Sequence, residues 1–345
     1  MLERSITVFP TYGYRDDAAE SASWVIRVRV WVHKGRHLPI PDELVRILLE
    51  EMGALRETEI LALRTRLADF IADDDSLEQV EFRFAGDVDN ETFRFAKRTD
   101  FNGLVEQEFR IPVKKIERVL ERDGKGSGWL TVVARCKGAE AAGRMRLIEP
   151  EGLSVISDVD DTIKITEIPA GPAIVMRNTF LRPYNAVPGM LENYRAFGTD
   201  TSFHYVSGGP WQMFNLIHSF LIVESGFPAG SFHMKDLRKN LLVPDSWRDL
   251  SAFLKGDLAT IEQKTAQITR LMVNLPNRRF VLVGDSGEKD PEIFDQIRRT
   301  FPEQVKEIII RDVVNERNRV ESVRLQGMTI IEAPTITRGI SRLTD

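Results

Sequence analysis

The chain has 345 residues, with 47 basic and 52 acidic side chains and a formal net charge of −5 at pH 7. Hydrophobic residues make up 42% of it and charged residues 29%, which excludes a disordered polyelectrolyte and an integral membrane protein. The mildly acidic balance also argues against a nucleic-acid-binding protein, which usually carries a basic stripe.

Cys136 is the single cysteine, which excludes an intramolecular disulfide framework and a multi-cysteine zinc site. The first ten residues contain no apolar signal-peptide core, and no run in the sequence approaches 18 apolar residues. We therefore expect a cytoplasmic protein of about two domains, at most peripheral on a membrane.

Residues 1–150 are predicted to form a mainly β, sandwich-like N-terminal domain. Apolar and polar residues alternate over 24–31, which is the pattern of a half-buried strand. Similar short segments follow at 81–84, 92–95, 108–111 and 129–133. Turn residues separate them at 86–90 and 124–128. Several short strands joined by such turns are typical of an antiparallel sandwich.

A helical insertion interrupts these strands at about 41–73. Leucines and other apolar residues recur there at helical spacing, as in the pairs Leu44 and Leu48, and Leu63 and Leu67. The pattern favours helices that pack on the sheet. A membrane-surface helix is the alternative, and the glutamates on the polar face argue against it because they would repel anionic lipid.

From residue 151 onward the pattern changes to apolar strands that alternate with helical stretches. Strands are predicted at Leu153–Ser157, 202–206, 279–283 and 307–313. This alternation predicts an α/β domain over 151–345, with a Rossmann-like parallel sheet and helices on both faces. Ligands bind at the carboxyl ends of the strands in such sheets, and three of these strands end in polar residues.

Carboxylates gather at two of the strand ends. Asp158 and Asp160 are two residues apart, so their side chains would share a face if the strand continued. Asp285 and Asp290 follow a later strand in a glycine-containing segment. Carboxylates brought together repel one another, and a bound divalent cation relieves this repulsion. Oxygen ligands of this kind suit Mg²⁺, so these four aspartates are the predicted metal site.

The middle strand end predicts a phosphate site. Ser207 precedes Gly208 and Gly209, and a hydroxyl before a Gly-Gly turn that opens a helix offers an O–H and free backbone N–H groups to phosphate oxygens. A lysine should neutralise the remaining charge, and Lys264 and Lys235 are the two candidates.

Each of these features alone has a common structural explanation. An Asp-x-Asp pair is usually a turn, a Gly-Gly pair is usually loop geometry, and a helical lysine usually faces solvent. Their joint occurrence, in this order at or just before apolar strand ends, favours a functional site. His204, three residues before Ser207, is interpreted as a packing residue of its strand.

The order of motifs over about 151–315 resembles the haloacid-dehalogenase superfamily of aspartate-nucleophile phosphatases. The first motif is DVDDT from Asp158 to Thr162, the second is Ser207, the third is Lys264, and the fourth combines Asp285 with Asp290. Four longer strings resemble the catalytic domain of the actin-patch-protein phosphatidate phosphatase family: SDVDDTIK at 157–164, VPGM at 187–190, SGGPW at 207–211 and GDSGEKDPE at 284–292. The glycines and proline before the tryptophan depart from the Ser-Ser or Ser-Pro typical of that family.

The resemblance implies a mechanism and a cofactor. Asp158 would attack phosphorus, and Asp160 would protonate the leaving group and then deprotonate water. Mg²⁺ would be held by Asp158, the backbone carbonyl of Asp160 and Asp285, with Asp290 orienting the metal ligands. Ser207 and Lys264 would hold the phosphate oxygens, and Thr162 would support the loop that carries Asp160.

The substrate implied by the resemblance is phosphatidate, which would be hydrolysed to diacylglycerol. Neither gap between the motifs obviously holds a large cap domain, so the site is expected to be open to a bulky substrate. Segment 173–184 is apolar and contains Arg177 and Arg182; it is interpreted as a flap packed on the sheet, with contact to a membrane or head group as the alternative. There are two rival functions. One is a phosphatase for a soluble or protein phosphoester, and the other is a catalytically idle adaptor that binds protein or membrane through its N-terminal half. Nothing in the sequence sets an oligomeric state.

Overall fold

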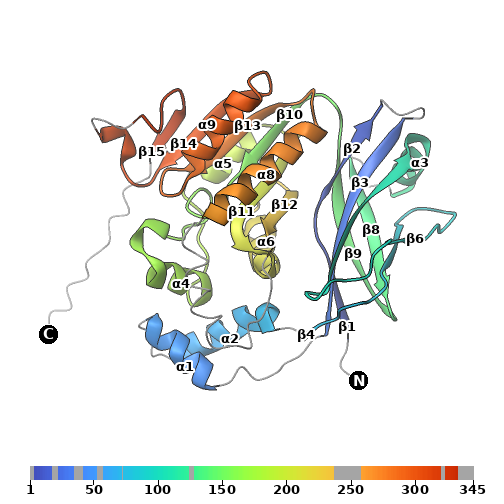
Figure 1. Cartoon of the computed structure of the whole chain (residues 1–345), viewed down its shortest axis with the longest axis horizontal. Coiled ribbons are helices and arrows are strands. Elements are labelled where there is room, and N and C mark those ends of the chain that lie inside the picture. The colour runs from blue at the N-terminus through green and yellow to red at the C-terminus, as the bar shows by residue number, and fades with distance from the viewer. Residues whose placement is uncertain are drawn as a thin grey trace.

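The structure, a computed structural model, describes residues 4–17, 22–34, 42–52, 57–71, 73–123, 128–236, 258–319 and 323–332. Two β-sheets stand beside each other in Figure 1. The first is formed by the N-terminal half and the second, which is entirely parallel, by the C-terminal half. This confirms the predicted combination of a mainly β half with an α/β half.

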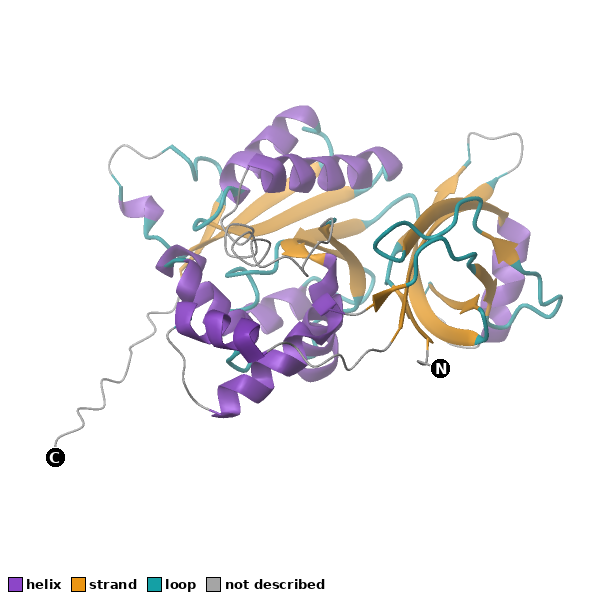
Figure 2. Ribbon diagram, turned by 60° about the horizontal axis from the view of Figure 1, so that its bottom comes forward, coloured by secondary structure: helices purple, strands orange, loops and turns teal. Residues whose placement is uncertain are grey.

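The N-terminal sheet has nine strands among the described residues, and Figure 2 shows it strongly curved around its own core. The strands are β1 (Arg4–Val8), β2 (Tyr12–Asp16), β3 (Ser23–Lys34), β4 (Asp73–Asp74), β5 (Glu81–Phe84), β6 (Phe93–Arg94), β7 (Leu104–Pro112), β8 (Trp129–Cys136) and β9 (Ala139–Ile148). Helix α3 (Val113–Asp123) packs on β7 and β8. The pairs are antiparallel except for β2 with β9.

Aromatic side chains fill this curved sheet. Phe82 lies at the centre of the group, with its ring 5.6 Å from Phe84, 5.9 Å from Phe95 and 4.7 Å from Phe109. Alternation along β5 and β7 sends these rings inward, as the period of two in the sequence predicts. Cys136 is buried in the same core, and most of the predicted turn at 124–128 lies outside the described residues.

The predicted insertion is confirmed as two helices, α1 (Asp42–Glu51) and α2 (Glu57–Ile71), but its predicted packing is corrected. Helix α2 contacts α4 (Pro172–Phe180) and the turn Trp211–Met213, which belong to the other half of the chain. Leu63 and Leu67 are fully buried in one core with Met176 and Phe180. The periodicity shows which face of the helix must be covered, but it does not say by what.

The C-terminal sheet has the strand order β12-β11-β10-β13-β14-β15. These strands are β10 (Leu153–Ser157), β11 (Ser202–Pro210), β12 (Gly230–Lys235), β13 (Arg279–Asp285), β14 (Val305–Asp312) and β15 (Thr329–Glu332). The helices that cover it are α5 (Met190–Ala196), α6 (Phe214–His218), α8 (Leu258–Asn274) and α9 (Asp290–Thr300). The alternating side chains of β10 and β13 enter two different cores, so both faces are covered by helices, as predicted.

The two halves share part of a core. Phe9 and Trp31 of the N-terminal half lie against Trp211, with ring centroids 6.3 Å and 4.8 Å away, and Phe9 also packs on Phe214 at 4.9 Å. Trp211 comes directly after β11, so the N-terminal sheet supports a segment next to the predicted site. Within the described part of the chain, no helix combines the length and the apolar character that crossing a membrane requires.

Candidate active site

Adjacent strands of the parallel sheet bring three predicted carboxylates together. Strands β10 and β13 pair in parallel, with Ser157 opposite Val283, so Asp158 and Asp285 emerge at the same edge. Asp290 is the first residue of α9, which follows β13 after a short loop. One carboxylate oxygen from each aspartate lies within 4.8 Å of the other two, and all three side chains are buried.

This arrangement leaves negative charge without full compensation. Burial raises the pKa values of Asp158 and Asp285 well above their usual range, and the carboxylate of Asp290 raises both further. The Oδ2 atom of Asp158 is buried and has no hydrogen-bond partner among the described residues. An orphaned carboxylate oxygen beside two other carboxylates fits a divalent cation with oxygen ligands.

Lys264, from α8, lies at the centre of the carboxylates. Its Nζ donates to Asp158 Oδ1 at 2.7 Å, to Asp290 Oδ1 at 2.9 Å and to Glu288 Oε2 at 3.3 Å. Burial would lower the pKa of Lys264, but the neighbouring carboxylates raise it well above its usual value. The lysine is therefore charged.

Lys235, the other candidate lysine, is placed differently. It ends β12, and its Nζ donates to Thr260 Oγ1 at 2.9 Å at the start of α8. Of the two lysines considered from the sequence, Lys264 is the one in contact with Asp158.

Asp160 belongs to a neighbouring network and not to the group of three aspartates. Its Oδ1 accepts from Lys164 Nζ and Thr166 Oγ1, both at 2.6 Å, while Ser207 Oγ lies 3.4 Å from Oδ2. Burial would raise the pKa of Asp160, but the ammonium group of Lys164 outweighs it and holds this pKa below the usual value. Asp160 thus has a basic partner of its own.

The segment from Ser207 to Pro210 is extended, which corrects one expectation. Strand β11 continues through both glycines to Pro210, and a 3-10 turn and the five-residue α6 follow, so no Gly-Gly turn opens a helix. The absence of a side chain at Gly208 still has a reason, since a Cβ there would lie 2.9 Å from the Thr260 side chain. The N–H of Gly209 donates to Ser207 Oγ at 3.0 Å.

The loop after β10 is organised by Asp161, whose importance the sequence did not reveal. Asp161 has a φ of 55°, in the left-handed region. Its carboxylate accepts the backbone N–H groups of Thr166, Glu167 and Ile168 at 2.9, 2.7 and 2.6 Å. Thr162 lies on the other side, where its hydroxyl is 3.4 Å from Asp285 Oδ2. These contacts order the loop that carries Asp160.

The GDSGEKDPE segment is close-packed against the metal-site candidates. A Cβ at Gly284 would lie 2.5 Å from Asp290 Oδ2, so only glycine lets this carboxylate approach the strand. Asp285 accepts the N–H of Gly287 at 2.7 Å. Arg324 binds both carboxylate oxygens of Glu292 at 2.9 Å and holds the far end of the segment.

Sequence reasoning missed two charged members of the site, Lys164 and Glu288. Both lie inside the motif strings, and this position was the signal that could have identified them. We call the following residues the site cluster: Asp158, Asp160, Lys164, Lys264, Asp285, Glu288 and Asp290. Five carboxylates face two ammonium groups in this cluster.

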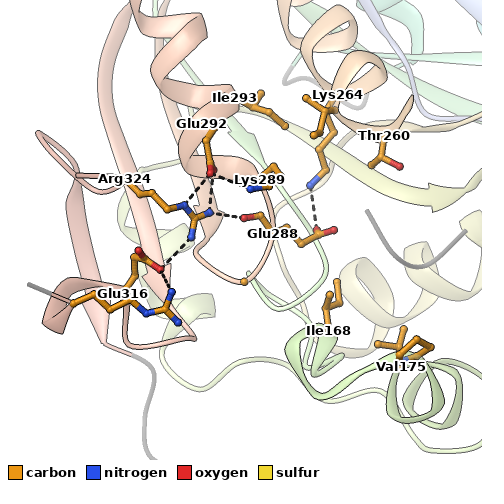
Figure 3. Close-up of a pocket in the computed structure, with 14 residues that line it drawn as sticks. Ile168, Val175, Thr260, Lys264, Glu288, Lys289, Glu292, Ile293, Glu316 and Arg324 are labelled. Carbon is orange, nitrogen blue, oxygen red and sulfur yellow. Dashed lines mark hydrogen bonds and ion pairs between the residues drawn. The ribbon is translucent and has the colours of Figure 1, made fainter. Parts of the chain in front are cut away.

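A pocket of about 500 Å³ adjoins the site cluster and shares Lys264 and Glu288 with it. In Figure 3, Ile168 and Val175 form one side of this pocket, and Glu316 and Arg324 lie on the other. A smaller cavity of about 30 Å³ is lined by Asp160, Gly208, Gly209 and Thr260 among others. The two cavities share Ile168, Val175, Thr260 and Glu288, so they adjoin one another.

Two other sequence interpretations can be placed. His204 is fully buried with its Nδ1 2.7 Å from Ser231 Oγ, and burial lowers its pKa to about 3, so it packs as a neutral ring. Segment 173–184 contains most of α4, which packs on α2. Its buried Phe180 belongs to the core that also contains Val155 and Val283 of the parallel sheet.

Residues 153–312 match a protein-family model described as "Phosphatidate phosphatase APP1, catalytic domain". Phosphatidate phosphatase APP1 of Saccharomyces cerevisiae is 27% identical over 209 residues, which cover 55% of this chain and 33% of that protein. An uncharacterized protein of Schizosaccharomyces pombe is 29% identical over 176 residues, which cover 49% of this chain and 27% of that one. The chain therefore spans about a third or less of the length of these curated relatives.

Among solved structures, a carbohydrate acetylesterase from Xanthomonas citri aligns with a TM-score of 0.27 at 10% identity, covering 90% of this chain and 60% of that one. A beta-galactosidase described as putative, from Bacteroides fragilis, aligns with a TM-score of 0.23 at 9% identity, covering 90% of this chain and 40% of that one. Likenesses this weak carry no argument about fold or function.

Proposed function

Because residues 153–312 belong to the phosphatidate phosphatase APP1 catalytic-domain family, we propose that this chain is a magnesium-dependent phosphatase that hydrolyses phosphatidate to diacylglycerol. The observation that carries the proposal is the site cluster, in which a nucleophile, a second carboxylate with its own basic partner and an acidic metal-site group lie at one sheet edge.

The first chemical step forms an aspartyl-phosphate. One carboxylate oxygen of Asp158 attacks phosphorus while the bond from phosphorus to the ester oxygen breaks, and the other oxygen would remain with the cation. Asp160 is a carboxylate in the free site because, against the effect of burial, Lys164 lowers its pKa, so the proton it needs arrives with the monoprotonated phosphate group of the substrate. Asp160 passes this proton to the leaving alkoxide, which departs as an alcohol. Lys264, 2.7 Å from Asp158 Oδ1, holds the carboxylate and offers positive charge to the phosphate oxygens.

The second step releases phosphate. Asp160, now a carboxylate, takes a proton from a water molecule as that water attacks phosphorus, and the bond between Asp158 and phosphorus breaks. The products are inorganic phosphate and a free Asp158, so protons and bonds balance over the cycle. Ser207, 3.4 Å from Asp160 Oδ2, is placed to orient a phosphate oxygen or the water, and the glycines beside it leave room for the phosphate.

A divalent cation fits the donor set of Asp158, Asp285 and Asp290, and Mg²⁺ is the proposed ion. When bound, it supplies positive charge that lets an anionic nucleophile approach an anionic phosphate. Thr162 and Gly287 hold the Asp285 carboxylate from the other side and so keep it turned toward the other two aspartates.

The substrate proposal rests on the family and is compatible with the larger pocket. Ile168, Val175 and Ile261 give this pocket an apolar side next to the site cluster, which can cover the first part of a lipid chain. A lipid substrate would be met at a membrane surface, so we propose peripheral contact with the membrane from the aqueous side. The intact site cluster argues against the idle adaptor, because an unused site has no need of buried, opposed carboxylates.

A phosphate-release assay with matched substrates tests the proposal. Phosphatidate in lipid vesicles, sugar phosphates, nucleotides and phosphopeptides are each supplied with Mg²⁺ or with a chelator. We expect release from phosphatidate that requires Mg²⁺ and is lost, by more than about a thousandfold, in Asp158→Asn, because an amide cannot act as the nucleophile. Preference for a soluble ester or a phosphopeptide would contradict the lipid substrate. Undiminished turnover by Asp158→Asn would contradict the mechanism.

A further inference from the structure

Arg66, from helix α2 of the N-terminal insertion, reaches into the catalytic half of the chain. Its Nη1 donates to the backbone carbonyl of Thr179, near the end of α4, at 2.7 Å. Its Cζ lies 4.4 Å from the centre of the Tyr184 ring. The Tyr184 hydroxyl donates to the same Thr179 carbonyl at 3.0 Å. Arg66 and Tyr184 therefore share one acceptor and hold each other in place.

Tyr184 connects Arg66 to the site cluster. The Nζ of Lys164 lies 5.0 Å from the centre of the same ring, and Lys164 is fully buried. Cations near an aromatic ring are attracted to its face, more strongly where water is excluded. The same ammonium group also contacts Thr166 and, at 2.6 Å, Asp160. A continuous series of contacts thus runs from Arg66 to Asp160.

The direction of Arg66 is set by the packing of α2. Leu63 and Leu67, on neighbouring turns of the same helix, are fully buried in the core that contains Met176 and Phe180. Asp69 accepts the side-chain N–H of Asn215 at 2.9 Å, which ties the helix to α6 as well. Helix α2 is therefore a fixed support on the catalytic half, and Arg66 projects from it toward Tyr184.

We propose that Arg66 is a positioning residue for the phosphatase reaction: through Tyr184 and Lys164 it holds the Asp160 carboxylate in the orientation needed to protonate the leaving group. The inference rests on the proposed function and adds to it that the N-terminal half is part of the catalytic apparatus. Without Arg66 the Tyr184 ring loses one of its two cationic neighbours and is held by its hydroxyl bond to Thr179 and its packing on Phe220, which constrains the ring less. The ring then limits the positions of the Lys164 ammonium group less strictly. Because that ammonium group pairs with Asp160, the Asp160 carboxylate is also less well oriented.

The inference predicts a defect that depends on the leaving group. An alkoxide leaves poorly without a proton, so a misplaced general acid slows the hydrolysis of an alkyl phosphate. Nitrophenolate leaves without protonation, so p-nitrophenyl phosphate hardly needs that acid. A purely structural role for Arg66 would lower both activities equally, because it would only reduce the fraction of folded enzyme.

The experiment compares Arg66→Ala with the wild-type full-length chain on phosphatidate in detergent micelles and on p-nitrophenyl phosphate, both with Mg²⁺. We expect kcat for phosphatidate to fall about tenfold, a part of the 10²–10⁴-fold that general acid catalysis supplies. The kcat for p-nitrophenyl phosphate and both KM values should stay within about twofold. Arg66→Lys, which keeps a cation near the ring, should recover part of the loss.

Two further variants guard against a folding defect. Tyr184→Leu should reproduce the loss on phosphatidate, and the double variant Arg66→Ala/Tyr184→Leu should be no slower than either single one, since both act through the same contacts. Arg64→Ala removes an arginine from the same helix that pairs with Asp42 of α1, and it should leave both activities unchanged.

Equal losses on both substrates, or additive losses in the double variant, would overturn the role of Arg66 while leaving the proposed function intact. If the wild type hydrolyses phosphatidate but not the aryl ester, the double variant alone tests the role of Arg66: additive losses in kcat for phosphatidate overturn it, and non-additive losses support it. A wild-type chain that hydrolyses neither ester would contradict the proposed function, and this inference with it.

Discussion

Each half of the molecule holds a cluster of charges around buried carboxylates, and the two clusters differ in the balance of negative and positive groups. The N-terminal charge cluster consists of Asp75 and Glu78 with Arg4, Lys34 and Lys137 around them. Lys34 lies 2.8 Å from Asp75, and Lys137 lies 2.6 Å from Glu78. Burial would raise the pKa of Asp75, but Lys34 and Arg4 outweigh it and hold this pKa below its usual value.

The site cluster has the opposite balance, with five carboxylates against two ammonium groups. Burial and the neighbouring carboxylates raise the pKa values of Asp158 and Asp285 well above the usual range. A cluster that is neutralised by its own side chains stabilises the fold. A cluster with surplus carboxylates is stable in its charged form only if a bound cation neutralises the surplus. The unbalanced cluster is for this reason the candidate active site.

Removing the lysine at the centre of the unbalanced cluster should have the largest effect. Lys264→Ala leaves Asp158, Asp290 and Glu288 without their shared ammonium group, and breaking a buried ion pair in this way costs about 3–5 kcal/mol of unfolding free energy. Urea unfolding should show this loss, and phosphate release should fall by at least about a hundredfold, as for loss of a group that stabilises the transition state.

Lys289→Ala is the matched control for Lys264→Ala. Lys289, which precedes α9, is 57% exposed and pairs with Glu292 at 3.3 Å, so its removal should change the unfolding free energy by less than about 1 kcal/mol. Equal losses of unfolding free energy in the two variants would contradict this prediction, because removing a lysine from the site cluster would then cost no more than removing one from the protein surface.

Mg²⁺ should stabilise the unbalanced cluster and not the balanced one. At a hundredfold excess over its Kd, a ligand that binds only the folded state adds about 2.7 kcal/mol to the unfolding free energy. Calorimetry with Mg²⁺ and with a chelator should show this gain in the wild type. It should disappear in Asp285→Asn and persist in Glu78→Gln, which alters the N-terminal charge cluster. A gain in both variants would contradict the proposed metal site.

The smallest effect is expected in the N-terminal charge cluster. Asp75→Asn should cost about 1–2 kcal/mol, at the low end for hydrogen bonds to charged groups, because Arg4 and Lys34 remain partly exposed to water. Since the folded-state pKa of Asp75 is lowered, its contribution is present above the unfolded pKa of about 3.9 and is lost as the pH falls through the folded value.

Urea unfolding of Asp75→Asn and of the wild type between pH 2.5 and 6 tests this dependence. The difference between the two proteins should be constant above about pH 5 and shrink below pH 4. Phosphate release per folded molecule should be unchanged. A difference that grows as the pH falls would show that the sign of the Asp75 shift is wrong.

The sequence alone determined the class of each half and the identity of the strand-end residues. Alternation over 24–31 and the apolar run at Leu153–Ser157 are local patterns, and local patterns decide which face of a strand is buried. Because parallel strands end at one edge, the positions of Asp158, Ser207 and Asp285 along the chain were enough to expect them near one another.

Only the tertiary structure decided which distant side chains meet. Motif position alone favoured Lys264 over Lys235. In the structure α8 places Lys264 against Asp158, while Lys235, at the end of β12, donates to Thr260. The apolar stripe of α2 required a cover, but that cover lies more than a hundred residues away, at α4. Contacts such as Arg66 with Tyr184 depend on how two halves of the chain dock, and no local periodicity encodes that docking.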